Sequence, residues 1–209
     1  YKVLTLTDCF EYDEQTYNYY GSYSFTGTKI EQAVVTAILN VTTDDKVVVD
    51  MIKGNNEQDY SSLKTLLENN AYQVNEVSLA TGDFDSNAKI AIMYAPSVDL
   101  DEKIVEKLST WLSNDGKYGR SLIYVPTADM GEMPNLDDFL KEWGMSIDRG
   151  YVFETDESTL VSASSPYAFT VSYGDYYKDN LKNSKIPVVV SESHAVNTVS
   201  YTHLRAHET

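Results

Sequence analysis

Apolar and polar residues alternate along the chain in blocks that predict strands and helices in turn. Three short apolar runs are rich in β-branched residues and stop at Gly or Pro or at a polar turn, as buried strands do. They cover residues 46–52, 89–94 and 121–125, and we interpret them as neighbouring inner strands of one sheet. A fourth segment, 72–79, alternates apolar and polar residues and predicts a half-buried strand.

Between these strands, apolar residues recur every three or four positions, which predicts amphipathic helices. The expected helices cover residues 30–41, 61–70, 101–113 and 136–143. Strands that alternate with helices through short loops favour a largely parallel sheet with helices on both faces. The expected fold class is therefore α/β, with a Rossmann-like layout.

The flanking segments predict strands instead. Residues 1–28 are typical of two strands separated by a polar turn, a β ribbon at the end of a preceding region. The Tyr-, Ser- and Val-rich segment after the last helix predicts strands at 151–153, 169–173 and 186–190. We therefore expect a Rossmann-like domain over residues 29–150 and a β-rich continuation of it over residues 151–199.

Two Tyr-rich clusters, at residues 12–23 and 167–177, suit half-exposed faces of such strands. A platform for a carbohydrate or a peptide is the alternative interpretation. Trp111 and Trp143 lie at helical spacing from Leu neighbours, so we expect them to belong to the core rather than to stack on a ligand.

The charge of the chain narrows the classes of function. Its 209 residues carry 16 Lys and Arg against 32 Asp and Glu, a formal net charge of -16. Such a surface repels polyanions, so nucleic-acid binding is not expected. No apolar stretch approaches the roughly 20 residues that cross a bilayer, and no signal peptide is visible. Any membrane attachment is expected only through segments outside these residues.

The turns after the expected strands carry no recognisable catalytic motif. A hydrolase or amidotransferase needs Ser or Cys on the turn after a central strand, with a His base nearby. The turn after residues 89–94 is Ala95-Pro96-Ser97, and Pro96 lacks the backbone donor that an oxyanion would use. His194 is the only candidate base. We therefore expect no enzymatic activity and no catalytic residue.

Cofactor and metal sites are equally unsupported. A dinucleotide site needs a Gly-x-Gly-x-x-Gly turn between strand and helix, which the chain lacks. Residues 83–87 begin like a calcium loop, but the twelfth position is Tyr94 inside a strand, so a solvated turn is favoured. The single Cys9 lies in a strand-like region and is typical of a structural thiol. We expect no cofactor and no metal ion.

The loop after the first inner strand is the best candidate for a ligand site. It has the sequence Gly54-Asn55-Asn56-Glu57 and lies at the carboxyl end of a strand, where α/β clefts form. The candidate ligand-binding residues are these four together with Pro96 and Asp129, which follow the other two inner strands, 89–94 and 121–125. The alternative is a plain turn whose acid lies near a helix N-terminus.

Four segments together resemble the gliding-motility-associated (GldG-like) auxiliary family of ABC transport systems. They are residues 30–42, the strand into the loop at 54–57, residues 70–74 and residues 95–100. The similarity covers residues 22–145. The family often has a Gly-His-Gly-Glu loop after the first strand of this unit, and here only the first Gly and the Glu are kept.

The resemblance implies a non-enzymatic auxiliary domain on the extracytoplasmic side of the cell membrane, beside an ABC permease and its ATPase. Its role would be to bind those partners or an extracytoplasmic ligand. The alternative is a small-molecule-binding or degenerate amidotransferase-like α/β domain that uses the strand-end loops.

The end of the chain is expected to have a different source. Residues 200–209 resemble translated adaptor read-through, which would make them non-native and the protein truncated at both ends. His203 and His207 then play no part in any functional argument.

Overall fold

The structure of the chain, a computed structural model, describes residues 3–174 and 187–198. The chain divides into two compact units. The first contains Tyr1–Pro96 and Glu106–Val125, and the second contains Ser97–Val105 and Pro126–Thr209. Their limits differ from the domain ranges expected from the sequence. The segment 200–209, Ile186 and the end of the second Tyr cluster lie outside the described residues.

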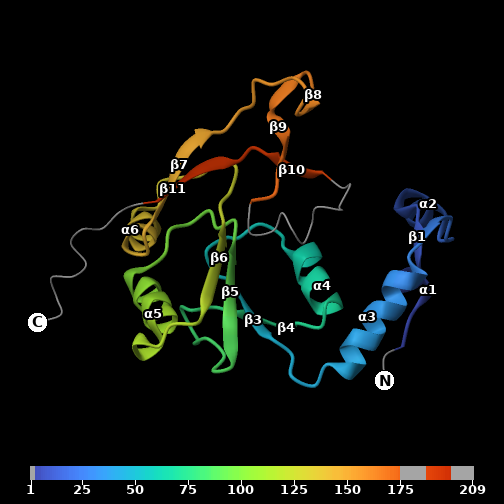
Figure 1. Ribbon diagram of the computed structural model, residues 1–209. Helices are drawn as coiled ribbons and strands as arrows, with labels where there is room; N and C mark the ends of the chain where they lie inside the picture. The colour runs from blue at the N-terminus through green and yellow to red at the C-terminus, as the bar shows by residue number, and fades with distance from the viewer. Residues whose placement is uncertain (1–2, 175–186, 199–209) are drawn as a thin grey trace, which may run out of the picture. The chain divides into compact units, whose positions relative to one another are not determined.

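A four-stranded parallel sheet forms the centre of the first unit (Figure 1). Its strands are β3 (Val48–Ile52), β4 (Gln73–Val77), β5 (Ala88–Tyr94) and β6 (Ser121–Val125). They lie in the order β4-β3-β5-β6, and every neighbouring pair is parallel. β3 is buried along its whole length, as its apolar run predicts. The α/β class is thus confirmed, and the three expected strands are neighbours, but β6 lies at the edge of the sheet instead of inside it.

Helices cover both faces of this sheet. α4 (Ser61–Asn69) and α5 (Glu102–Ser113) lie on opposite sides of it (Figure 1). The core on the α4 side contains Val49, Met51 and Ile92, with Leu63 and Leu67 of α4 packed against them. α5 buries Leu108, Trp111 and Leu112. Opposite faces follow because right-handed crossovers from β3 to β4 and from β5 to β6 run in opposite directions across the sheet.

The chain passes from β4 to β5 through a loop, residues 78–87, instead of a helix. Such a loop cannot pair its own backbone groups, so side chains must do it. The Asp50 carboxylate accepts a hydrogen bond from the backbone N–H of Asp85 at 2.8 Å, and another from Asn75 Nδ2 at 3.1 Å. Lys107 Nζ donates to the carbonyls of Leu79 and Gly82 at 2.9 and 2.7 Å. The turn expected to be solvated is therefore tied to β3 and α5.

The segment before β3 differs most from expectation. Its elements are α1 (Leu6–Cys9), β1 (Phe10–Tyr12), α2 (Glu14–Tyr20), β2 (Phe25–Thr28) and α3 (Ile30–Thr42). β1 and β2 pair antiparallel as two strands of a ribbon do, but the Tyr-rich stretch between them is a helix. Asp13 starts that helix by accepting a hydrogen bond from Thr16 N at 2.6 Å, and the left-handed Gly21 ends it. Cys9 ends α1 instead of lying in a strand.

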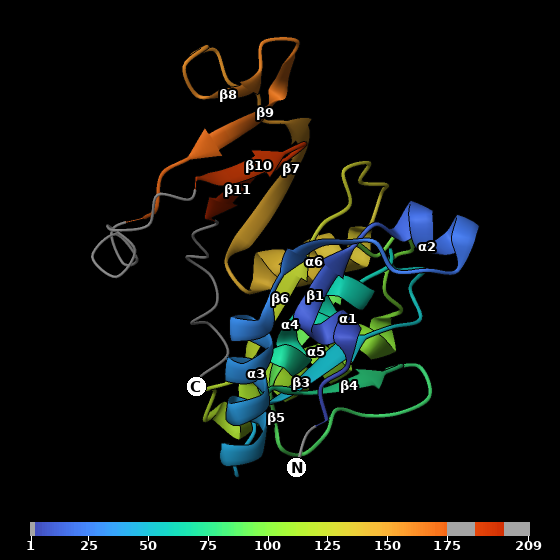
Figure 2. The ribbon, with the colours of Figure 1, turned by 90° about the vertical axis from the view of Figure 1, so that its right-hand side faces the viewer.

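The second unit combines one helix with short antiparallel strands (Figure 2). They are α6 (Pro134–Glu142), β7 (Met145–Tyr151), β8 (Leu160–Ser162), β9 (Ser165–Val171), β10 (Val188–Ser191) and β11 (His194–Thr198). β7 pairs with β11, and β9 pairs with β8 and β10. The helix and the strands at β9 and β10 were expected. The strand expected at 151–153 lies earlier, as β7, and β8 and β11 were not predicted.

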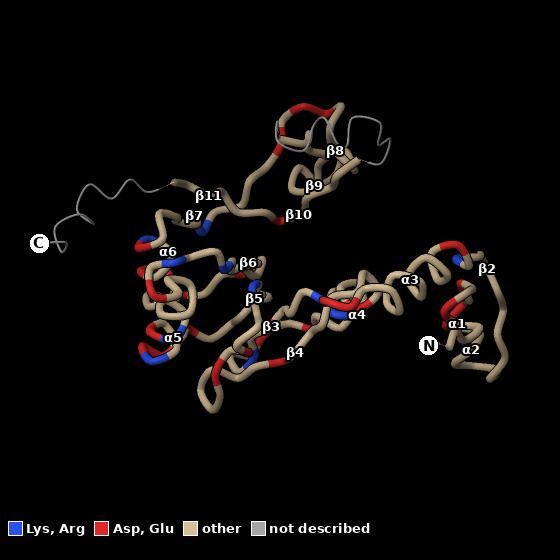
Figure 3. Tube along the Cα trace, turned by 60° about the horizontal axis from the view of Figure 1, so that its bottom comes forward, with Lys and Arg blue, Asp and Glu red and all other residues tan. Residues whose placement is uncertain are grey.

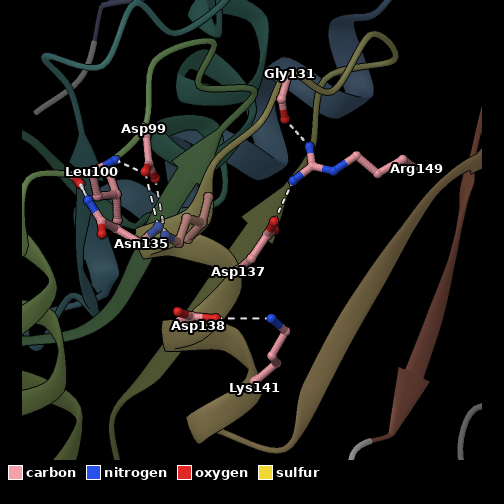
Figure 4. A network of polar contacts seen from close by, with 9 residues as sticks. Asp99, Leu100, Gly131, Asn135, Asp137, Asp138, Lys141 and Arg149 are labelled. Carbon is pink, nitrogen blue, oxygen red and sulfur yellow. Dashed lines mark hydrogen bonds and ion pairs between the residues drawn. The ribbon is translucent and has the colours of Figure 1, made fainter.

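Asp99 fixes the start of α6 although it lies 36 residues before Asn135 (Figure 4). Its carboxylate accepts hydrogen bonds from the backbone N–H groups of Asn135 and Leu136 at 3.0 and 3.1 Å. The residue before the helix, Met133, provides no side-chain cap, so Asp99 takes that role. Arg149 of β7 donates to the Asp137 carboxylate and so ties α6 to the strand that follows it.

We expect Asp50→Ala to destabilise the protein by about 1–3 kcal/mol, because it leaves half-buried donors of Asp85 and Asn75 without an acceptor. Asp50→Asn keeps one acceptor, so its urea midpoint should lie between those of Asp50→Ala and the native protein. Urea unfolding measures both changes. Asp45→Ala, at an exposed position, is the matched control and should leave the midpoint within experimental error. Equal midpoints for Asp50→Ala and Asp45→Ala would contradict the assignment.

Glu76 of β4 should make stability depend on pH. Hydrogen bonds from Lys64 at 2.8 Å and Lys53 at 3.1 Å lower the pKa of Glu76 below its ordinary value of 4.5. The stabilisation is then complete above pH 4.5 and is lost as the pH falls through the lower folded value. Because both pairs are partly exposed, we expect less than about 1 kcal/mol. The stability difference between the native protein and Glu76→Gln, measured by urea unfolding, should disappear in acid, whereas Glu106→Gln should show no such trend.

Candidate functional site

The loop after β3 is closed by its own acid. The Glu57 carboxylate accepts hydrogen bonds from the backbone N–H groups of Gly54 at 3.0 Å and Asn55 at 2.9 Å. Gly54 has a φ of 117°, which a side chain rarely tolerates, and a Cβ there would lie 3.2 Å from Ser78 Oγ. Asn55 is buried, whereas Asn56 is exposed and left-handed. The four residues predicted as ligand-binding thus form one compact, internally hydrogen-bonded turn.

A second tight turn follows β5 at Ala95. This residue is buried and takes a left-handed conformation, with a φ of 48°, which is uncommon for any residue other than Gly, Asn or Asp. Its N–H donates to the Val125 carbonyl at 2.7 Å, and its carbonyl accepts from Gln58 N at 3.2 Å. The next residue, Pro96, is fully buried and has no N–H. Both backbone groups of Ala95 are therefore occupied.

These two turns meet where the order of the sheet reverses. β4 and β5 flank β3 on its two sides, so the carboxyl ends of β3 and β5 border the switch point where parallel α/β sheets usually bind ligands. The Gln58-to-Ala95 hydrogen bond spans this point. The rings of Tyr60 and Tyr94 lie beside it in an edge-to-face contact at 6.5 Å. One backbone hydrogen bond and one aromatic contact thus connect the carboxyl ends of β3 and β5.

This arrangement lacks the parts that acyl transfer requires. An oxyanion hole on such a turn uses the N–H of the residue after the nucleophile, and Pro96 cannot supply it. Glu57, the acid of the neighbouring turn, already accepts two backbone hydrogen bonds. Hydrogen bonds within the chain hold both turns in place.

Asp129 and His194 belong to the second unit. The Asp129 carboxylate accepts a hydrogen bond from the Tyr151 hydroxyl at 2.9 Å, and this bond raises the pKa of Tyr151 above its ordinary value of 10.0. His194 Nε2 lies 3.1 Å from the carbonyl oxygens of both Thr127 and Ala128, and Nδ1 lies 3.3 Å from that of Gly150. Both ring nitrogens of His194 thus face backbone carbonyl oxygens, and these contacts connect β11 with β7 and with the loop after β6.

Within residues 3–174 and 187–198, no three His, Cys, Asp or Glu side chains gather as metal ligands would. Over the same residues, none of the helices combines the length and the apolar character needed to cross a bilayer.

No protein-family model matches the chain. A search of curated proteins finds no significant match either.

Helix α3 presents a second candidate surface, of a different kind. Among its apolar residues only Ala33 is buried. The exposed ones, between 41% and 54% accessible, are Ile30, Val34, Val35, Ile38, Leu39 and Val41. The apolar side of an amphipathic helix normally packs against its own domain. The sequence does not show whether the apolar side of α3 is buried in this way or exposed. The exposure of α3 could be found only from the structure.

We expect Glu57→Ala to destabilise the protein by about 1–2 kcal/mol, because two backbone donors of the loop lose their acceptor. Glu57→Gln retains one acceptor and should cost less. Urea unfolding again gives the magnitudes, and Glu106→Ala on the exposed side of α5 is the matched control. If Glu57→Ala and Glu106→Ala unfold at the same urea concentration, Glu57 does not hold the loop.

Proposed function

We propose that this chain is a non-enzymatic auxiliary domain of a bacterial ABC transport system, placed on the extracytoplasmic side of the cell membrane. It acts by binding, through the apolar face of α3, to the permease of that system, and the ATPase completes the complex. The observation that carries the proposal is the row of exposed apolar side chains on α3. The same segment, residues 30–42, contributes to the resemblance to the GldG-like family.

Exposed apolar residues on one helix face favour a protein partner. Scattered apolar residues are common on protein surfaces, but a contiguous patch usually marks an interaction site. The described residues are otherwise strongly acidic, with Asp and Glu spread along the whole chain (Figure 3). α3 interrupts this pattern, because its only acid is Glu31 in the first turn. A membrane-protein subunit with an apolar docking surface is a suitable partner.

The closed carboxyl edge of the sheet supports a role without catalysis. Ala95 stands where an α/β hydrolase or amidotransferase carries its nucleophile, and Pro96 follows it. The strand order also supports the Rossmann-like layout that the sequence predicts. Numbered along the chain, the four strands follow the order 2-1-3-4, which is that of the first four strands of flavodoxin-like sheets.

One observation favours the second candidate, a degenerate amidotransferase-like or small-molecule-binding domain. The left-handed Ala95 keeps the backbone shape of a nucleophile-bearing turn while lacking the nucleophile. In that case the edge formed by Gly54, Asn55, Asn56, Glu57 and Pro96 would bind a ligand, and α3 would play no part.

The experiment is co-purification of the protein with an ABC permease and its ATPase, from detergent-solubilised membranes of cells that express all three. Ile38→Asp should abolish the complex, since it buries a charge in an apolar interface. At this exposed position the same change should alter stability by no more than about 0.5 kcal/mol. Val161→Asp, on β8 and equally exposed, is the matched control and should leave the complex intact.

The result separates the two candidates. A complex that survives Ile38→Asp contradicts docking through α3. A complex that survives Ile38→Asp but is lost with Asn56→Gly, which keeps the left-handed backbone of the loop, would favour the carboxyl edge instead.

A further inference from the structure

A cavity of about 670 Å³ lies at the amino edge of the parallel sheet. Its walls come from the starts of β3, β4 and β5 and from the loop before β6. The cavity therefore lies at the end of the strands opposite to the Gly54 loop and Ala95. Its volume falls within the range of sites for small organic molecules. All its lining residues belong to the first unit.

Positive charge gathers in this cavity although the protein is strongly acidic. Among the Lys and Arg residues of the described ranges, six form no ion pair with a described carboxylate. Three of the six, Lys46, Lys89 and Arg120, line the cavity, and a fourth, Lys117, lies in the same loop as Arg120. In a chain with twice as many acids as bases, three cations at one place that form no ion pair indicate an anionic ligand.

Two of these cations are held in place without being neutralised. Lys46 Nζ donates to Asn40 Oδ1 at 3.0 Å. Arg120 donates to the Trp111 carbonyl at 2.9 Å, and its guanidinium carbon lies 5.3 Å from the centre of the Trp111 ring. Fixing side chains before a ligand arrives lowers the entropic cost of binding. Lys89 stands exposed at the start of β5 and completes the group.

The loop over the cavity is held in an unusual backbone conformation. Five residues take left-handed angles, namely Asn114, Asp115, Gly116, Tyr118 and Gly119. A bulky residue such as Tyr118 rarely adopts a φ of 54°, and such strain is typical of functional sites. Asn114 Nδ2 donates to the Tyr118 carbonyl at 3.0 Å and so holds the turn. The Tyr118 side chain is 58% exposed and lines the cavity.

The cavity also contains acceptors for hydroxyl groups. Asp44 and Asp45 line it, and a carboxylate is a strong acceptor from an O–H donor. Their charges would repel a compact anion such as phosphate more than an acid whose charge and hydroxyls lie on opposite sides. The lining thus combines three cations, two acceptors and one exposed ring.

We propose that this amino-edge cavity binds a small organic acid that carries hydroxyl groups. The cationic lining of Lys46, Lys89 and Arg120 attracts its carboxylate, and its hydroxyls donate to Asp44 and Asp45. Sugar acids and hydroxy acids share this chemistry. The site is separate from the α3 surface and stands whether or not α3 docks on a transporter.

The test is calorimetric titration of the purified protein with four probes: glucuronate, glycerate, glucose and inorganic phosphate. Glucuronate or glycerate should bind with a Kd below about 1 mM, more tightly than glucose and phosphate. Which of the two binds better distinguishes a sugar acid from a hydroxy acid. Lys89→Gln should weaken that binding about tenfold, because it removes one charge-assisted hydrogen bond.

Lys103→Gln is the matched control, since Lys103 also forms no ion pair but lies on α5 outside the cavity. It should bind the acid as the native protein does. Lys46→Gln is a second variant and should act in the same direction as Lys89→Gln. The proposal is overturned if neither acid binds, if glucose or phosphate binds as tightly, or if Lys89→Gln and Lys103→Gln have equal affinities.

Discussion

The buried carboxylate of Asp50 needs hydrogen-bond donors inside the sheet. The arrangement of the first unit depends on which groups provide them. Asp50 is completely inaccessible to solvent in the middle of the most buried strand. It accepts from the loop that leads to β5, and Lys107 of α5 binds the same loop from its other side. This lets β5 pair with β3 without a crossover helix. The pairing of β3 with β5 therefore places the closed turns at the carboxyl ends of the strands and the cationic cavity at their amino ends.

The inner strands and the helices that cover them could be predicted from the sequence, because a strand that is buried on both faces is apolar along its length. β3 is an apolar run and α5 repeats apolar residues at helical spacing. The Tyr-rich α2 could not, since its aromatic residues suit a strand as well as a helix. There the Asp13 cap and the left-handed Gly21 decide the outcome. The sequence predicts this strand at 151–153, later than the observed β7, because the charged residues Asp148 and Arg149 interrupt the alternation typical of a strand.

The candidate site was predictable only where its residues are neighbours in sequence. Residues 54–57 form one turn, as expected, and the hydrogen bond from Gln58 to Ala95 brings the Pro96 turn to the same edge. Asp129 belongs to the other unit, and its carboxylate is bonded to Tyr151. The left-handed conformation of Ala95 leaves no trace in the sequence, because alanine is found in every kind of element. The cationic cavity was missed because Lys46, Lys89 and Arg120 come from three separate segments.

The capping of α6 by Asp99 affects how the protein can be divided. The second unit is discontinuous in sequence, because Ser97–Val105 lies between two parts of the first. A peptide that begins at Pro126 would lack Asp99, and the first turn of α6 would then expose two backbone amides that nothing else nearby caps. Cleavage between β6 and α6 would therefore not release an independent module. The chain passes between the two units three times, so a single cut cannot separate them.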